Sequence, residues 1–278
     1  MKPVLQCPVC GLPLHADAQG CRCENRHSFD RSRYGYVNLL QKQRKKLRGD
    51  DAEMIRARRD FLEGGAYLPL LRCIADAVQS ASPRMIADIG CGEGWYSCSL
   101  LRELPGETGL AGIDISPAAL RYAAKRAEQC GLASRTEWAA ASVSRLPFAS
   151  ESCDLLLNLF APCEAGEFAR VLREDGLLVR AIPLERHLWE LKQAIYREPY
   201  ENRPVLSAPA QFTLLDVQRI TYRFTVSGQQ MQNLFAMTPY AHKTAPEDAK
   251  RLPVTETMEV QAAFGVLICR KQPRGNSM

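Results

Sequence analysis

The sequence predicts an α/β fold, in which a parallel sheet with helices on both faces follows a small cysteine-rich module. Segments typical of strands and of helices alternate from residue 66 onward, and such alternation favours a parallel sheet. A glycine-rich turn follows the first of these strands, and four of the eleven cysteines fall within residues 7–23. We therefore divide the chain into an N-terminal module (1–40), a basic linker with a helix (41–65) and a main domain (66–278).

Composition and charge exclude several classes of protein. Hydrophobic residues make up 46% of the 278 residues and charged residues 24%, which is typical of a globular chain. No apolar run approaches the roughly 18 residues that span a bilayer, and the first residues lack the apolar core of a secretory signal, so we expect a cytoplasmic protein outside the membrane. The net charge is +5, but residues 1–48 alone carry +7. A basic module on a nearly neutral domain favours an acidic partner such as nucleic acid.

The cysteine cluster has the spacing of a structural zinc site. Cys7 and Cys10 form one pair, and Cys23 and His27 form a second pair after twelve intervening residues. Three thiolates and one imidazole complete a tetrahedron with no open position for water, so the predicted site is structural and not catalytic. The ion replaces the hydrophobic core that a module of about 40 residues cannot build. Cys21 is the alternative to Cys23, and an incidental or redox-active group of cysteines is the alternative to zinc.

After the zinc ligands the sequence is rich in arginine, lysine and tyrosine. Arginines alternate with Tyr34 and Tyr36, and a run of lysine and arginine occupies residues 42–48. Such side chains contact phosphates and stack on unpaired bases, which favours RNA as the partner. The alternative is a solvated loop, the ordinary state of a charged run.

Two helices and a short strand lead to the glycine-rich turn. Apolar residues at helical spacing predict a helix over 51–63, capped by Asp50 or Asp51, and a second over 66–80 with Leu68 on its buried face. The next segment, Met-Ile-Ala-Asp-Ile at 85–89, predicts a buried strand that runs directly into the turn.

The glycine-rich turn and the acids beside it predict a nucleotide-cofactor site. Its glycines permit a tight turn and close backbone approach to a ligand at a helix N-terminus. A second acid ends the next strand about twenty residues later, where a carboxylate accepts hydrogen bonds from ribose hydroxyls. An acid two positions before the first glycine is typical of S-adenosylmethionine (SAM) sites, whereas NAD sites more often lack it. The predicted cofactor residues from this pattern are Asp88, Gly90, Gly92, Glu93, Gly94 and Asp114.

The turn and its acids resemble the first motif of SAM-dependent methyltransferases, so we expect the later elements to complete a Rossmann-like, class I SAM-dependent methyltransferase domain. In that class the turn after the third strand lines the adenine, and the resemblance implies this role for Ser142. The fourth strand ends at the carboxyl edge of the sheet, where an open α/β fold places its chemistry. The polar tail 271–278 is expected to fray. The predicted elements are helices over 117–130 and 164–173, and strands near 135–140, 153–160, 177–182, 212–215, 220–226 and 263–269.

The zinc signature, the glycine-rich turn and a segment reading Arg-His-Leu-x-Glu-Leu-Lys at 186–192 occur together in this chain. In this combination the chain resembles, over nearly its whole length, the bacterial 23S ribosomal RNA guanine-N1 methyltransferases of the RlmA type. The turn is shared by many methyltransferases, whereas the zinc signature with the Arg-His-Leu segment is distinctive. Asp51 departs from the serine expected there. Other matching segments are 35–40, 49–54, 57–62, 145–148, 161–163 and 237–241.

The resemblance implies specific contacts and partners. The zinc ribbon is implied to help recognise a hairpin loop of 23S rRNA, and the chain is implied to form a homodimer. Two subfamilies modify neighbouring guanines, and several motifs lean toward the Gram-negative type. Apart from the resemblance, Tyr67 indicates ordinary helix packing and His187 a surface or core histidine. The residues implied to contact SAM are Tyr67, Gly92, Glu93 and His187, and those implied to hold zinc are Cys7, Cys10, Cys23 and His27.

The acceptor side of the site is less marked in the sequence. Guanine N1 carries a proton, yet no histidine or carboxylate in the turn 158–163 stands out as its base. We expect Asn158 to orient the edge of the guanine and Phe160 to stack on the flipped base. Two other functions stay open: methylation of a small molecule, which leaves the basic module unexplained, and a non-catalytic rRNA-binding assembly factor that retains SAM as a structural ligand.

Overall fold

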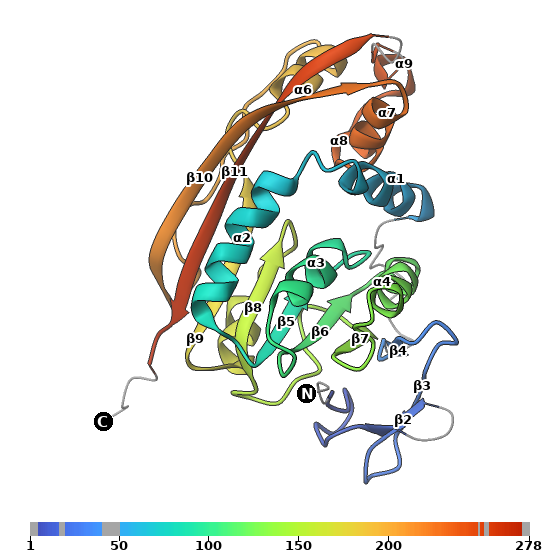
Figure 1. The fold of residues 1–278 in the computed structure, drawn as a ribbon, viewed down its shortest axis with the longest axis vertical. Coiled ribbons are helices and arrows are strands. Elements are labelled where there is room, and N and C mark those ends of the chain that lie inside the picture. Colours follow the sequence, from blue (N-terminus) through green and yellow to red (C-terminus); the bar gives the residue numbers. More distant parts are fainter. Residues whose placement is uncertain (1–4, 17–19, 41–50, 250, 253–255, 274–278) are drawn as a thin grey trace.

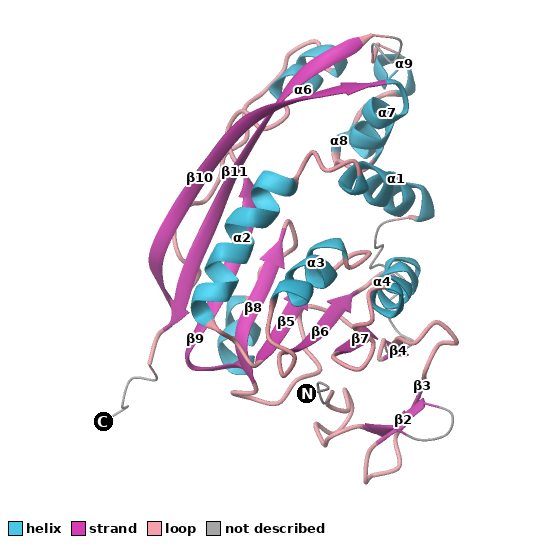
Figure 2. Ribbon diagram, viewed as in Figure 1, coloured by secondary structure: helices cyan, strands magenta, loops and turns pink. Residues whose placement is uncertain are grey.

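The computed structural model describes residues 5–16, 20–40, 51–249, 251–252 and 256–273. Within these ranges the chain forms two sheets, a small one in the N-terminal module and a large one in the main domain (Figures 1 and 2). The small sheet contains, in order, β1 (His15–Ala16), β2 (Gly20–Arg22) and β3 (Ser28–Asp30), with antiparallel pairing throughout.

The large sheet has the strand order β10-β11-β9-β8-β5-β6-β7-β4. Six neighbouring strands, β9-β8-β5-β6-β7-β4, are parallel, and the last two in sequence form a long antiparallel pair at the other edge. The order reverses at β5, which pairs with β6 on one side and β8 on the other. The strands are β4 (Val37–Asn38), β5 (Met85–Ile89), β6 (Gly109–Asp114), β7 (Thr136–Ala140), β8 (Cys153–Leu159), β9 (Leu172–Pro183), β10 (Phe212–Ser227) and β11 (Thr257–Lys271).

Helices cover both faces of this sheet and extend past its carboxyl edge (Figure 1). One face carries α2 (Leu68–Ala81), α3 (Trp95–Glu103) and α4 (Pro117–Gln129), and the other carries α5 (Ala165–Val171). The remaining helices lie beyond the carboxyl ends of the parallel strands and are α1 (Ala52–Glu63), α6 (Trp189–Ile195), α7 (Gly228–Ala236), α8 (Tyr240–Lys243) and α9 (Pro246–Ala249). None of the helices in the described ranges has both the length and the apolar character that a membrane span requires.

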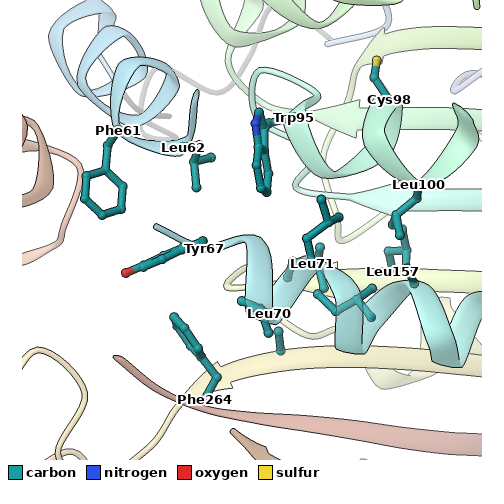
Figure 3. Packing of buried hydrophobic residues seen from close by; sticks show 14 of the residues in the cluster. Phe61, Leu62, Tyr67, Leu70, Leu71, Trp95, Cys98, Leu100, Leu157 and Phe264 are labelled. Atoms are coloured by element: carbon teal, nitrogen blue, oxygen red, sulfur yellow. The ribbon is translucent and has the colours of Figure 1, made fainter. Parts of the chain in front are cut away.

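Alternation along the strands divides the interior into two layers of apolar side chains. Leu155 and Leu157 of β8 pack with the α2–α4 layer, whereas Leu156 between them packs with the α5 layer. This is the period of two that a strand buried on both faces must have. In the first layer Tyr67 lies between Phe61 and Phe264 (Figure 3), with ring centroids 5.2 and 4.9 Å away in edge-on geometry. These rings join α1, α2 and β11 at the carboxyl edge of the sheet.

The N-terminal module packs directly on the main domain. Leu5 and Leu14 share the α5-side apolar layer with Phe148 of the main domain. Arg31 forms an ion pair of 2.7 Å with the buried carboxylate of Glu137 on β7. The last part of the predicted module extends the main sheet, because β4 pairs in parallel with β7. The module is therefore anchored by shared core, by charge and by backbone pairing.

Of the two predicted caps of the first helix, the structure selects Asp51, whose side chain accepts hydrogen bonds from two backbone amides of the first turn. Other predictions differ from the structure in strand bounds and in the burial of single residues, and β11 begins at Thr257, ahead of the predicted strand 263–269. Leu68 is 41% exposed, because Tyr67 fills the buried position at the start of α2. The two strands predicted near 212–226 are one continuous strand, β10, and β9 begins earlier than predicted, with a register shift after its first residue. Lys271, predicted to fray, is buried and donates a hydrogen bond to the Leu172 carbonyl at 2.6 Å.

Candidate functional site

The four predicted zinc ligands converge in the N-terminal module, where their ligand atoms all lie within 4.8 Å of one another. Cys10 Sγ lies 3.6 Å from Cys23 Sγ, and His27 Nδ1 lies 3.5 Å from Cys7 Sγ and 3.4 Å from Cys23 Sγ. A tetrahedron with Zn–S bonds of ~2.3 Å has edges of ~3.8 Å, so the cluster already has nearly the spacing that zinc needs. A hydrogen bond from the Leu12 backbone N–H lowers the pKa of Cys10 to about 6, which favours the thiolate that binds metal.

Cys21 lies outside this cluster. Its thiol is buried in β2, and its sulfur accepts a hydrogen bond from the Arg31 guanidinium at 3.4 Å. Arg31 is the residue that also pairs with Glu137, so Cys21 belongs to the contact between the module and the main domain. The structure thus separates the two alternatives for the third thiolate and groups Cys23, not Cys21, with the other ligands.

The two tyrosines predicted to stack on bases have partners within the protein. The guanidinium groups of Arg33 and Arg121 lie 4.8 and 4.3 Å from the ring centroid of Tyr34. Tyr36 is partly buried against the main core. The surface around Tyr34 is therefore formed by arginine side chains that lie over its ring. The lysine and arginine run at 42–48 lies outside the described residues.

The glycine-rich turn connects β5 to α3 at the point where the strand order reverses. Gly90, Gly92 and Gly94 have φ values of +82°, +55° and +74°, in the left-handed region that glycine adopts without strain. A Cβ atom at Gly90 would collide with the side chain of Ala161 in the neighbouring strand-to-helix turn. Gly92 N–H donates to Asp114 Oδ2 at 2.9 Å, so the turn is held against the end of β6.

Two buried carboxylates stand beside this turn. Asp88 and Glu93 are each 2% exposed, and each has one carboxylate oxygen, Oδ1 and Oε2, that lacks a hydrogen-bond partner among the described residues. The other Asp88 oxygen accepts from the Ser97 hydroxyl at 2.5 Å. Burial raises the pKa of Asp88 to about 7; it also raises the pKa of Glu93, against the opposing charge of Arg58. Unpaired buried carboxylate oxygens suit a cationic ligand group, and the ammonium of SAM fits that requirement.

Asp114 and Ser142 follow neighbouring strands at the same edge. Asp114 ends β6, and its Oδ1 accepts from Ser116 N–H at 2.8 Å, which fixes the carboxylate at the head of α4. Ser142 follows β7, and its hydroxyl lies 2.8 Å from that of Ser144. Both side chains line the same cavity as Asp88. Their contacts with ribose and adenine stay a prediction.

Tyr67 and His187 meet in the wall of the same cavity. The Tyr67 hydroxyl lies 3.4 Å from His187 Nε2, and His187 Nδ1 accepts a hydrogen bond from Ala263 N–H at 3.2 Å. Because Nδ1 is an acceptor, the proton of the neutral ring is on Nε2 and points toward Tyr67. Burial lowers the pKa of His187 to about 3, so the ring stays neutral near pH 7. Both rings pack on Phe264, with centroids 4.9 and 4.5 Å away.

The turn after β8 places its two predicted residues differently. Phe160 has a φ of +59°, lines the cavity and is 45% exposed. Asn158 is buried and is absent from the cavity wall: its Nδ2 donates to the Pro162 carbonyl at 3.0 Å, and its Oδ1 accepts from Arg180 Nε at 3.1 Å. The parallel register pairs Asn158 with Arg180 of β9. Arg180 itself lines the cavity, and a charge within the apolar run Leu-Leu-Val-Arg-Ala-Ile was the sequence signal for it.

One cavity of about 1230 Å³ joins these groups at the carboxyl edge of the sheet. Small-molecule pockets commonly occupy ~300–1,000 Å³, so this one has room for more than one ligand of that size. Gly94 does not line it, because Gly94 caps α3 and faces Ala123 and Trp138. The predicted residues that line the cavity are Tyr67, Asp88, Gly90, Gly92, Glu93, Asp114, Ser142, Phe160 and His187.

Known families match both parts of the chain. Residues 5–48 match the family model described as RlmA, N-terminal, and residues 86–176 match the model described as Methyltransferase domain. The solved structure of the YcgJ protein from Bacillus subtilis superposes with a TM-score of 0.51 at 15% identity, covering 73% of this chain and 98% of that one. At that identity the likeness concerns the fold alone.

Curated relatives match nearly the full length. A protein from Micromonospora griseorubida, named "Putative 23S rRNA (guanine-N(1)-)-methyltransferase", is 36% identical over 98% of each chain. The 23S rRNA (guanine(748)-N(1))-methyltransferase of Streptomyces fradiae is 31% identical over 97% of each chain. These matches include the N-terminal module as well as the sheet.

Replacement of a cluster cysteine tests the zinc assignment. We expect Cys23→Ser to lose the bound zinc and to expose the module to protease, because only three ligands remain. Cys21→Ser is the matched control two residues away, and it should keep one zinc per chain as measured by atomic absorption. Equal zinc content in the two variants would contradict the ligand set.

The raised pKa of Asp88 predicts that SAM binding releases a proton. At pH 7 a carboxyl group with a pKa of about 7 is about half protonated, and a bound ammonium favours the ionised form. Calorimetry in two buffers of different ionisation enthalpy should show release of about half a proton per SAM at pH 7, and less at pH 8. The variant Asp88→Asn cannot release this proton. The difference in proton release between the two proteins therefore separates the contribution of Asp88 from any proton taken up by the SAM amino group. An identical proton balance in the two proteins would refute the assignment.

Proposed function

The chain belongs to the family of 23S rRNA (guanine-N1)-methyltransferases, and we propose that the large cavity at the carboxyl edge of its sheet holds SAM and a flipped guanine side by side during methyl transfer. The observation that carries the proposal is the joining of two sets of residues in one space of about 1230 Å³. The glycine-rich turn and its acids form one side. Phe160 and Arg180 form the other.

On the cofactor side, the residues around the turn hold SAM by its charged and polar ends. The unpaired oxygens of Asp88 and Glu93 bind the ammonium. The carboxylate of Asp114 accepts hydrogen bonds from the ribose hydroxyls in exchange for the one it accepts from Gly92 N–H. Ser142 lines the adenine. When bound, SAM supplies an electrophilic methyl group. The task of the protein is therefore to hold the acceptor nitrogen in line with that methyl group.

On the acceptor side, Phe160 and Arg180 are placed to receive the guanine. Phe160 offers an exposed ring that is backed by Phe264, with centroids 5.6 Å apart, and such a ring stacks on an extruded base. Methyl transfer to N1 releases the N1 proton, which passes to solvent water, and the positive charge of Arg180 stabilises the guanine anion that forms as this proton leaves. His187 is not the base for that proton, because its Nδ1 is occupied and its Nε2 carries hydrogen. His187 and Tyr67 instead form a fixed polar wall.

Asn158 acts on both acceptor-side groups from behind the cavity. One end of its amide holds the Phe160–Pro162 turn through the Pro162 carbonyl, and the other end holds the Arg180 guanidinium. This revises the expectation that Asn158 touches the guanine. We assign it as a positioning residue.

The substrate is 23S rRNA, and we propose a hairpin loop as the recognised element. A loop supplies unpaired bases that can be splayed out and stacked. The zinc module adds the arginines around Tyr34 to the same chain, and phosphate contacts by arginine do not depend on sequence. A cytoplasmic location agrees with this substrate. The homodimer implied by the family resemblance stays a prediction.

The proposed reaction is tested with large-subunit rRNA from a strain that lacks the activity. The purified protein, tritiated SAM and this rRNA should give label on one guanine, and mass mapping should place the methyl group on N1. A short RNA that contains only the target hairpin should also be labelled. Label on the intact rRNA without label on the hairpin would remove the hairpin part of the proposal, and label on neither, with SAM still bound, would remove RNA methylation.

The role of Asn158 predicts a loss of turnover without a loss of cofactor. Asn158→Leu removes both hydrogen bonds at similar volume, so kcat should fall by about 100-fold, the scale of a misplacement near 1 Å. The Kd for SAM should change less than 3-fold, since Asn158 lies outside the cavity wall. Asn158→Asp keeps the acceptor for Arg180 and should retain more activity. A folded Asn158→Leu enzyme with unchanged kcat would exclude this role.

A further inference from the structure

A fully buried lysine lies behind one wall of the cavity. Lys192 of α6 has 0% exposure, although lysine is almost never buried without a strong reason. Its Nζ donates to the Tyr200 carbonyl at 2.9 Å and to Asn202 Oδ1 at 2.7 Å. The same ammonium lies 4.6 Å from the Tyr200 ring centroid and 5.3 Å from that of Tyr240. The cation is thus contacted by neutral groups, most of them from one short segment, and the carboxylate of Glu201 in the same segment adds a favourable charge.

That segment, residues 200–205, has no helix or strand, yet it is tied down at several points. Asn202 N–H donates to the Glu185 carbonyl at 2.8 Å, and its Nδ2 donates to the Leu184 carbonyl at 2.7 Å. Together with the bond from Lys192, Asn202 uses both ends of its amide. We call residues 200–205 the wall segment, because all six line the cavity.

The wall segment carries apolar side chains in exposed positions. Tyr200 is 49% exposed and Val205 is 66% exposed, and with Phe160 they are half of the exposed large apolar side chains among the described residues. All three line the same cavity. Single exposed apolar side chains scattered over a surface are ordinary, whereas a cluster of them at one site indicates a binding surface.

We propose that Tyr200 is a second stacking platform, for an unpaired RNA base next to the target guanine, and that Lys192 is the residue that holds this platform in place. The Tyr200 ring is fixed by the Lys192 ammonium and by the Tyr196 ring, whose centroid is 5.6 Å away. A fixed and accessible aromatic ring stacks on a base at little entropic cost. The inference rests on the proposed function, since it names which further nucleotide the same site contacts.

Cationic side chains line the cavity together with its exposed apolar ones. Arg203 of the wall segment and Arg180 both line it, whereas the acids of the lining are Glu201 and those at the glycine-rich turn. An aromatic ring beside guanidinium groups is the arrangement that binds single-stranded nucleic acid, because the ring takes the base while the cations attract the phosphates. A single flipped guanine on Phe160 leaves Tyr200 and Val205 without a partner, whereas a neighbouring base accounts for them.

The test measures RNA affinity with a labelled hairpin and with the same hairpin made abasic at each neighbour of the target guanine. Stacking of one base contributes ~1–3 kcal/mol, so Tyr200→Ala should weaken binding by about 5- to 150-fold. Removal of one neighbouring base should weaken binding to the wild type by a similar factor and should leave binding to Tyr200→Ala unchanged. Tyr200→Phe keeps the ring and should bind normally. Leu215→Ala, an equally exposed apolar residue outside the cavity, is the matched control.

The role of Lys192 is tested by non-additivity. Lys192→Met should weaken RNA binding while SAM affinity stays within about 3-fold, and the double variant with Tyr200→Ala should bind no more weakly than Tyr200→Ala alone. If the two effects add, Lys192 does not act through Tyr200. Should Lys192→Met fail to fold, the Tyr200 variants alone still decide the platform.

Two outcomes separate this inference from the proposed function. Unchanged hairpin affinity in Tyr200→Ala, with normal methylation by the wild type, would overturn the platform and leave the reaction standing. If the wild type methylates no rRNA, the proposed function fails first, and the abasic series then reports only whether a base stacks on Tyr200.

Discussion

The reversal of strand order at β5 is the constraint on which the rest of this structure depends. Because β5 pairs with β6 on one side and β8 on the other, the chain leaves the carboxyl ends of β5 and β8 toward opposite faces of the sheet. A crevice must open where neighbouring connections diverge in this way. The glycine-rich turn fills one side of it and the Phe160–Pro162 turn the other. Gly90 is needed there, because any side chain would strike Ala161 across the crevice.

The walls of this cavity are built from polar groups buried at a cost in stability. Asp88 and Glu93 each keep an oxygen unpaired, and Lys192 keeps a cation out of water. Such groups weaken the ligand-free fold, since burial of a charge without full compensation is unfavourable. They are held in place by neighbours such as Ser97 and Asn202. A site preorganised in this way does not have to reorient its dipoles when the ligand arrives, which is where a transferase gains its rate.

The zinc module packs against the main domain and is not a separate unit on a linker. Its ion supplies the stability that so short a segment lacks, but its outer surfaces continue into the main domain. The Arg31 guanidinium connects the Cys21 thiol to the Glu137 carboxylate, and β4 adds a last strand to the main sheet. The arginines beside Tyr34 therefore have a fixed orientation relative to β7. This connection fixes the spacing between the module and the cavity of the main domain.

The sequence alone determined the features that depend on residues close together in the chain. The cluster of zinc ligands, the glycine-rich turn with Asp88 and the alternation of strands and helices after it were predictable, because each is encoded by spacing or by local periodicity. The family was recognisable from its combination of motifs. Where the local signal was ambiguous the prediction was wrong. Leu68 was expected to be buried, but it is exposed and Tyr67 is buried instead.

Only the tertiary structure decided which residues that are distant in the sequence contact one another. Asn158 lies outside the cavity wall and bonds to Arg180, because the register of β8 against β9 brings Arg180 beside it. Lys192 and Tyr200 had no local signal at all, since a lysine in a helix and a tyrosine in a loop are ordinary until burial and contact are known. The physical reason is common to both cases. The role of a side chain depends on its hydrogen-bond and charge partners. Those partners come from distant segments, and the topology of the sheet decides which segments lie close together.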